Sequence, residues 1–246
     1  NFAGVGSISQ AVTDANSGGG IITFACSGTI IFATELTITA NVTINADGNT
    51  VIFDETGNDN RFFTVNAGAS LTLINARLMG GVNSTMGGAI LNNGTLTVNN
   101  SEFISNGITG NGGVIYNNGT LTITGSLFSG NTADFGGAIF HLGGLDLNVT
   151  GSRFTNNTAD FGGAIYNNLG FAFVNFSTFD NNIGLTAGGG IHTDGTMTVG
   201  NSTFFANSSP AGAAFQQTQT IGVGSTSMVY VTMVDNTGTT GTAIHV

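Results

Sequence analysis

Short runs of alternating apolar and polar residues, separated by turn-forming residues, follow one another along this chain. In the segment after Gly112, three such runs are Val114–Tyr116, Leu121–Ile123 and Ser126–Phe128. Alternation with a period of two residues is typical of half-buried strands. None of these runs has helical spacing, and the 40 glycines of the chain disfavour helices. The pattern therefore predicts an all-β protein built from short strands.

This group of runs recurs at steps of 24 to 29 residues. One recurring block, Gly-Gly-small-aliphatic, begins at Gly87, Gly112, Gly136, Gly162 and Gly188, and in a less regular form at Gly212 and Gly241. A second block, Phe-x-x-Asn, comprises Phe103–Asn106, Phe128–Asn131, Phe154–Asn157, Phe179–Asn182 and Phe204–Asn207. Self-similarity at a period of 20–50 residues indicates a solenoid or a related array.

Three strands in about 25 residues, with no hairpin inside the unit, predict one coil of a single-stranded parallel β-helix. The chain has room for roughly nine such coils. Equivalent strands of successive coils lie about 4.8 Å apart, so residues one period apart become neighbours. We therefore expect buried ladders of Ile90, Ile115, Ile139, Ile165 and Ile191, of Leu96, Leu121, Leu147 and Met197, and of Phe103 to Phe204. The asparagines that follow the phenylalanines should form a ladder of hydrogen-bonded amides.

The beginning of the chain differs from the repeats. Ile8, Ala11, Val12 and Ala15 follow helical spacing and precede Asn16-Ser17-Gly18, which predicts a short amphipathic helix. A solenoid needs an atypical cap over its first coil. We therefore divide the chain into an N-terminal extension with a cap helix (residues 1–20) and one β-helix domain (residues 21–246).

The charge of the chain limits its partners. It has three basic and 13 acidic residues and a net charge of −10. Nucleic-acid binding needs a basic surface and is therefore not expected. No apolar stretch approaches the roughly 18 residues that a membrane span needs, so we expect no membrane insertion. The single cysteine, Cys26, has no disulfide partner in the chain and is expected in the core of an early strand.

Ten Asn-x-Ser/Thr sequons occur, and the most loop-like of them are Asn41, Asn83 and Asn207. They are candidate glycosylation sites if the protein is exported. The chain begins with Asn1 rather than Met, which fits either removal of an export signal or a truncated sequence. We favour export and expect an extracellular or cell-surface location.

The co-occurrence of Gly-Gly-Ala-Ile (Gly87–Ile90, Gly136–Ile139, Gly162–Ile165) with Phe-x-x-Asn resembles the polymorphic outer-membrane protein repeat. The resemblance covers about residues 70 to 246. It implies a secreted, right-handed parallel β-helix. Members of this family are mostly surface adhesins or uncharacterised exported proteins, so the resemblance is specific for fold and weak for function.

Parallel β-helices often carry polysaccharide lyases and hydrolases, which need clustered acids. The nearest approach to a cluster is Asp134 and Asp160, one coil apart, which form a weak candidate for a calcium site. Solvated turn residues are the favoured interpretation. Arg153 is expected to point outward, with Glu102 too far away to pair with it. The three histidines form no metal-ligand cluster and are expected in a turn and on the surface. We therefore predict no catalytic residue, no metal and no cofactor.

An aromatic stripe is expected on the outer face of the first strand of each unit. Its members are Leu91, Tyr116, Phe140, Tyr166 and His192. An exposed stripe could stack sugars or join subunits, or it could only stabilise the sheet. Phe171 and Phe173 stand where other coils carry threonine. Either they form an exposed apolar spot, or this coil slips by one residue, which would invert every side chain.

Our first functional hypothesis is a non-enzymatic structural protein that stacks head to tail into a filament or surface layer. The contact would join Phe2 and Val5 at one end to Ala243, Ile244 and Val246 at the other, because open strand edges template further pairing. One alternative is a surface adhesin or glycan-binding rod that acts through the aromatic residues. Another is an enzyme that degrades polysaccharides.

Overall fold

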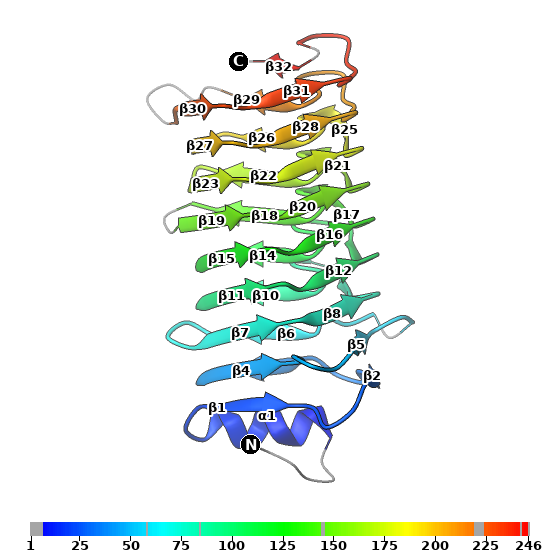
Figure 1. Ribbon diagram of the computed structural model, residues 1–246, viewed down its shortest axis with the longest axis vertical. Coiled ribbons are helices and arrows are strands. Elements are labelled where there is room, and N and C mark those ends of the chain that lie inside the picture. The colour runs from blue at the N-terminus through cyan, green and yellow to red at the C-terminus, as the bar shows by residue number, and fades with distance from the viewer. Residues whose placement is uncertain are drawn as a thin grey trace.

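The computed structural model describes residues 7–57, 59–83, 85–143, 146–218, 224–241 and 243–245. The chain winds into a stack of coils in which each strand pairs in parallel with its equivalents in the neighbouring coils (Figure 1). The predicted all-β parallel solenoid is confirmed. Among the described residues, the only helix is α1 (Ile8–Asn16), at the N-terminal end of the stack.

Three sheets of nine strands each form the walls of the solenoid. The first contains β1 (Gly20–Thr23), β4 (Asn41–Asn45), β7 (Ser70–Ile74), β11 (Thr95–Asn99), β15 (Thr120–Thr124), β19 (Asp146–Thr150), β23 (Phe171–Asn175), β27 (Thr196–Gly200) and β30 (Thr226–Val229). The second contains β2 (Gly28–Ile31), β5 (Val51–Asp54), β8 (Ala76–Met79), β12 (Glu102–Ile104), β16 (Leu127–Ser129), β20 (Arg153–Thr155), β24 (Thr178–Asp180), β28 (Thr203–Phe205) and β31 (Thr232–Val234). The third contains β3 (Leu36–Ile38), β6 (Phe63–Val65), β10 (Ile90–Asn92), β14 (Ile115–Asn117), β18 (Ile139–Leu142), β22 (Ile165–Asn168), β26 (Ile191–Thr193), β29 (Phe215–Gln217) and β32 (Ile244–His245).

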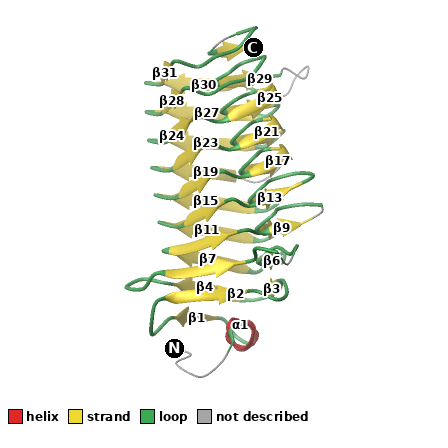
Figure 2. Cartoon of the chain, turned by 90° about the vertical axis from the view of Figure 1, so that its right-hand side faces the viewer, coloured by secondary structure: helices red, strands yellow, loops and turns green. Residues whose placement is uncertain are grey.

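A fourth sheet of five strands lies along one side of the stack (Figure 2). It consists of β9 (Val82–Asn83), β13 (Gly107–Ile108), β17 (Thr132–Phe135), β21 (Thr158–Phe161) and β25 (Ile183–Ala187). The prediction of three strands per coil missed this sheet. Its segments, such as Thr132–Phe135, are short and polar, so in sequence they resemble turns.

The core consists of the predicted ladders. The isoleucines from Ile90 to Ile191 pair in register in the third sheet and are fully buried. The rings from Phe103 to Phe204 stack almost in parallel, with centroids 4.7 or 4.8 Å apart. This spacing matches the distance between strands, so each ring contacts its equivalent in the next coil. In the column of Leu96, Leu121, Leu147 and Met197, the coil of β23 carries Ala172.

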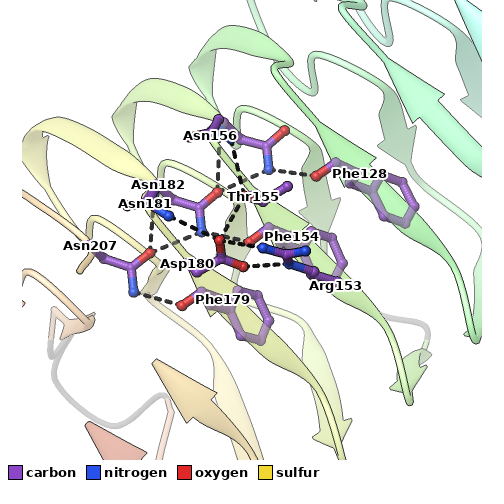
Figure 3. Close-up of polar contacts among 11 residues, drawn as sticks. Phe128, Arg153, Phe154, Thr155, Asn156, Phe179, Asp180, Asn181, Asn182 and Asn207 are labelled. Atoms are coloured by element: carbon purple, nitrogen blue, oxygen red, sulfur yellow. Dashed lines mark hydrogen bonds and ion pairs between the residues drawn. The ribbon is translucent and has the colours of Figure 1, made fainter. Parts of the chain in front are cut away.

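The buried asparagines satisfy the backbone at the corner that follows each phenylalanine. The Oδ1 atom of Asn182 accepts hydrogen bonds from the backbone N and the Nδ2 of Asn157, at 3.0 and 2.9 Å. Its Nδ2 donates to Asn207 Oδ1 and to the carbonyl oxygen of Phe154, each at 2.9 Å (Figure 3). The same pattern repeats from Asn106 to Asn236. The predicted amide ladder is therefore confirmed, and it leaves little unsatisfied polarity at a buried corner.

The glycine block has a steric cause. Gly162 has a φ of 65°, in the left-handed region that favours glycine. A Cβ atom on Gly163 would overlap the carbonyl oxygen of Gly189 in the next coil. The first glycine therefore makes the corner, and the second lets adjacent coils approach.

The cap helix also forms as predicted. The Ser7 side chain accepts a hydrogen bond from the backbone N of Gln10 and so caps the first turn. Val12 and Ala15 are buried against the first coils. This helix covers the apolar interior at the N-terminal end of the stack. At the other end, Met228 and Met233 of β30 and β31 are only partly buried.

Cys26 was expected in the core, and this prediction is wrong. The residue is exposed, in the bend between β1 and β2. Only the strand residue Ile22 before it reaches the interior fully. No helix of the described chain has the length and apolar character needed to cross a bilayer.

Candidate binding surface

The predicted aromatic stripe forms a continuous ladder on the third sheet. Its members from Leu91 to His192 pair in register through four successive strand pairs. The rings of Tyr116 and Phe140 stack at 5.1 Å, those of Phe140 and Tyr166 at 5.4 Å, and those of Tyr166 and His192 at 4.9 Å.

The stripe is less open than expected. Phe140 and His192 are each only 4% exposed, and the other members are half-buried. Phe135 of β17 packs edge-on against Tyr166, and Phe161 of β21 packs edge-on against His192. The expectation of an exposed stripe is therefore wrong at Phe140 and His192. The ring of Phe140 lies between the stacked rings of Tyr116 and Tyr166, and Phe161 of the unforeseen fourth sheet packs against His192.

A polar cluster surrounds the end of the stripe formed by Tyr166 and His192. The hydroxyl of Tyr166 donates a hydrogen bond to Asp194, and His192 Nε2 lies 3.3 Å from Asp194 Oδ1 and 3.2 Å from Thr218 Oγ1. Burial, together with the hydrogen bond to Asp194 and its charge, raises the pKa of Tyr166 well above its usual value. Burial acts to raise the pKa of Asp194 as well, but hydrogen bonds from His192 and Tyr166 outweigh it, and the pKa of Asp194 is lowered.

Two of the three histidines do not lie where the sequence suggested, and the side chain of His245 lies outside the described part of the structure. His192 is buried, and so is His141, whose Nδ1 lies 2.9 Å from Asn117 Nδ2 in a second polar ladder inside the third sheet. His141 occupies the column of Asn92, Asn117 and Asn167, so an inward position was readable from the register.

Arg153 pairs with an acid that sequence reasoning missed. Its Nε and Nη2 atoms donate to both carboxylate oxygens of Asp180, at 2.8 and 2.9 Å (Figure 3). Thr155 and Asn181 donate to the same carboxylate. Burial alone would raise the pKa of Asp180, but these hydrogen bonds and the charge of Arg153 lower it. The signal was present, since Asp180 lies one coil and two residues beyond Arg153.

The other two arginines also have acidic partners. Arg61 Nε lies 3.2 Å from Glu35, and Arg77 Nε lies 3.6 Å from Glu102 in the next coil. The three basic residues of the chain are thus all paired with acids. No arginine is therefore left unpaired to attract an anionic ligand.

Asp134 and Asp160 occupy equivalent exposed positions of β17 and β21. Among the described residues, no group of three or more histidine, cysteine or acidic side chains is placed to hold a metal ion. A calcium site at these two carboxylates and a non-enzymatic role both stay predictions.

Phe171 and Phe173 are exposed on the outer face of β23, by 51% and 47%. Their strand keeps the register of its neighbours, since Phe171 pairs with Asp146 and Thr196 and Phe173 with Asn148 and Thr198. The alternative of a one-residue slip is therefore wrong. Leu169 and Phe176 extend the exposed apolar line at the two ends of the strand, and we name these four residues the β23 strip.

Two residues of the β23 strip have an unfavourable backbone. Leu169 and Phe176 have φ values of 61° and 50°, in the left-handed region. The corner of Phe176 carries Asn100, Gly125, Gly151 and Asn201 in other coils, which adopt this conformation more readily, and Tyr230 in the coil of β30. Bulky residues in this region cost of order 1–2 kcal/mol each, and such outliers gather at functional sites.

The three candidate glycosylation sites differ. Asn41 is exposed on β4, where its Oδ1 accepts a hydrogen bond from Ser70. The side chain of Asn83 lies outside the described part of the structure. Asn207 is buried in the amide ladder and donates to Phe179 O and Asn236 Oδ1. Its assignment as a glycan site is wrong, because a sugar on Nδ2 would replace one of these two donors and would need space at a fully buried position.

The residues proposed for end-to-end assembly are only partly placed. Ile244 pairs with Phe215 in the third sheet, and Ala243 is half-buried beside it. Phe2, Val5 and Val246 lie outside the described residues. The end-to-end contact therefore stays a prediction.

These ladders and sheets define a parallel β-solenoid made of repeats. Residues 125–141 and 151–168 match the family model of the Chlamydia polymorphic membrane protein repeat. Both segments contain the Gly-Gly-Ala-Ile block, so the predicted resemblance is confirmed in this part of the chain. No curated protein and no solved structure matches the chain.

Proposed function

We propose that this protein is an adhesin-like rod of the cell surface that makes its contact through the β23 strip. The repeat match and the solenoid fold suggest a structural or adhesin-like protein associated with the outer membrane or cell surface. The laddered interior supports the structural part of this proposal, because each coil is held to the next by stacked rings and amides.

The observation that carries the contact is the composition of the β23 strip. Four large apolar side chains line the outside of one coil, and the same strand has only Ala172 in the core column where the two adjacent coils have Leu147 and Met197. The neighbouring strands β19 and β27 carry only polar residues at these positions, so the sheet does not require aromatic residues on this face. Exposed apolar residues in a strained backbone indicate a binding surface rather than a requirement of the fold.

Site-directed attachment can test this proposal. Cys26 is the single cysteine, it is exposed, and it lies in the first coil, six strands of the first sheet away from β23. Beads that carry the protein through Cys26 should adhere to monolayers of epithelial cells. The double substitution Phe171→Thr and Phe173→Thr should abolish adhesion while leaving the circular dichroism spectrum unchanged.

Ile31→Thr is a control, because Ile31 is an exposed apolar residue on β2, more exposed than either phenylalanine. It should leave adhesion unchanged. Adhesion that the double substitution does not alter would refute the proposal.

Head-to-tail stacking is a second candidate, favoured by Met228 and Met233, which face the interior but are incompletely covered. In the described residues, β30 and β31 are the last strands of their sheets, and such edges accept further strands. At the opposite end, however, helix α1 covers the first coil. Electron microscopy of the 246-residue chain should show filaments if stacking occurs, and monodisperse rods at high concentration would contradict it.

A further inference from the structure

We infer that the β23 strip binds a neutral, linear oligosaccharide across the rod. This inference rests on the proposed contact role of the β23 strip and names the chemistry of its partner. It depends on the shape of the strip, on the charges around it and on its area.

The strip is a line rather than a round patch. Phe171 and Phe173 are two residues apart on one strand, so their Cα atoms lie about 7 Å apart on the same face. Leu169 and Phe176 lengthen this line at the two corners. In Figure 1, β23 crosses the stack between β19 and β27, so a ligand lying along the strip would run across the rod.

Polar side chains border this line on both sides. Asp146 and Asn148 of β19 pair in register with the two phenylalanines, and Thr196 and Thr198 of β27 pair with them from the other side. Each border lies one strand spacing from the rings, about 4.8 Å. A pyranose presents an apolar ring face and a rim of hydroxyl groups. The phenylalanine rings can stack on the apolar face of the sugar. The carboxylate, amide and hydroxyl groups beside them can form hydrogen bonds with its hydroxyl groups.

The charges favour a neutral ligand. Asp146 is the charged residue on these three strands, and the arginines of the chain are paired with acids. With a net charge of −10, the surface would repel sulfated or uronate-rich glycans and anionic lipids.

The area favours a small ligand over a second protein chain. The four side chains are 47–63% exposed. With roughly 200 Å² for each fully exposed side chain, the strip offers about 400 Å². A stable protein interface buries about 800 Å² on each partner. To reach that area, a second copy of the chain would also have to bury the threonines around the strip. Threonine side chains offer little apolar surface for such an interface.

Isothermal titration calorimetry with defined probes tests the inference. Cellohexaose and chitohexaose are the neutral probes, and a heparin hexasaccharide is the anionic one. At least one neutral hexasaccharide should bind, and Phe171→Thr with Phe173→Thr should weaken it about tenfold or more. Ile31→Thr should bind like the unaltered protein, and heparin should not bind.

Four outcomes would overturn the inference: no binding of either neutral probe, binding that the double substitution does not change, stronger binding of heparin, or a dimer in sedimentation that the double substitution dissociates. The bead assay separates this inference from the proposed function. Strip-dependent adhesion that neither neutral hexasaccharide inhibits would refute the oligosaccharide and leave the contact role intact, whereas strip-independent adhesion would refute the contact role.

Discussion

The coil that begins at Gly112 and the coil that begins at Gly162 share their interior. Each contributes one isoleucine, one phenylalanine and one asparagine to the same buried ladders: Ile115, Phe128 and Asn131 in the first, and Ile165, Phe179 and Asn182 in the second. The hydrogen bonds of the two asparagines follow one pattern. The path of the chain is therefore set by residues that the two coils have in common.

Their exteriors differ. The first coil presents Thr120 and Thr122 on its outer face, where the second presents Phe171 and Phe173. The first turns its corner with Gly125 and the second with Phe176, at similar positive φ. The comparison teaches that the ladders fix the fold, while the outward columns are free to change and can carry a binding surface. The predictions below test this division.

Removing an asparagine of the amide ladder should have the largest effect. Asn182→Ala leaves the backbone N of Asn157 and the carbonyl oxygen of Phe154 without their partners. The free energy of unfolding should fall by about 3 kcal/mol or more, since each buried unsatisfied group costs about 1–3 kcal/mol. Urea denaturation followed by circular dichroism would measure the loss.

Asn131→Ala should lower the free energy of unfolding by the same amount as Asn182→Ala if the interiors of the two coils are equivalent. Asn118→Ala, at an exposed position with one side-chain bond to Asn93, should change stability by less than about 0.5 kcal/mol. Unequal losses at Asn131 and Asn182 would break the comparison.

Leu121→Ala should have the next largest effect, about 2–3 kcal/mol in the free energy of unfolding, because it opens a cavity in the core. The second coil already has Ala172 in this column, between Leu147 and Met197. Urea denaturation of the Leu121→Ala variant measures how much stability the leucine side chain adds to the first coil. A loss below about 1 kcal/mol would mean that this column contributes little to either coil.

Asp180→Asn should have a smaller effect, which depends on pH. The pKa of Asp180 is lowered in the folded state, so its contribution is present above its unfolded pKa of about 3.9 and is lost as the pH falls through the lower folded value. At pH 7 the substitution should destabilise the protein by about 1–2 kcal/mol. Below about pH 4 the difference between the two proteins should shrink.

Thermal unfolding at a series of pH values measures this convergence. Asp134→Asn is the control, since Asp134 is an exposed acid of β17, in the fourth sheet. A constant difference between pH 7 and pH 3 would show that the ion pair with Arg153 is not its source.

Phe176→Asn should have the smallest effect, in the opposite direction. Asparagine occupies this corner at Asn100 and Asn201 and adopts the left-handed conformation more easily. The substitution should therefore stabilise the protein by about 1 kcal/mol, and it should also weaken binding to the β23 strip. Denaturation gives the first value and calorimetry the second. Loss of stability would mean that Phe176 supports the fold rather than a contact.

The sequence alone determined the period, the strands of the three main sheets and the buried ladders. It could do so because identical side chains one period apart can stack only if each coil lies directly over the previous one. The regular spacing of the phenylalanines from Phe103 to Phe204 indicates this arrangement. The cap helix was also readable, from the helical spacing of Ile8 to Ala15.

Only the tertiary structure decided which outward residues are accessible. His192 lies against Phe161 of the fourth sheet, whose short polar segments gave no strand signal, and Phe140 is buried between two stacked rings of its own sheet. The register of the coils brings Asp180 within reach of Arg153, but only the structure showed that the two side chains join across columns two residues apart. The exposure of an outward side chain depends on the path of the segments that connect the strands. That path follows from the backbone geometry at the corners, and the alternation of apolar and polar residues does not reveal it.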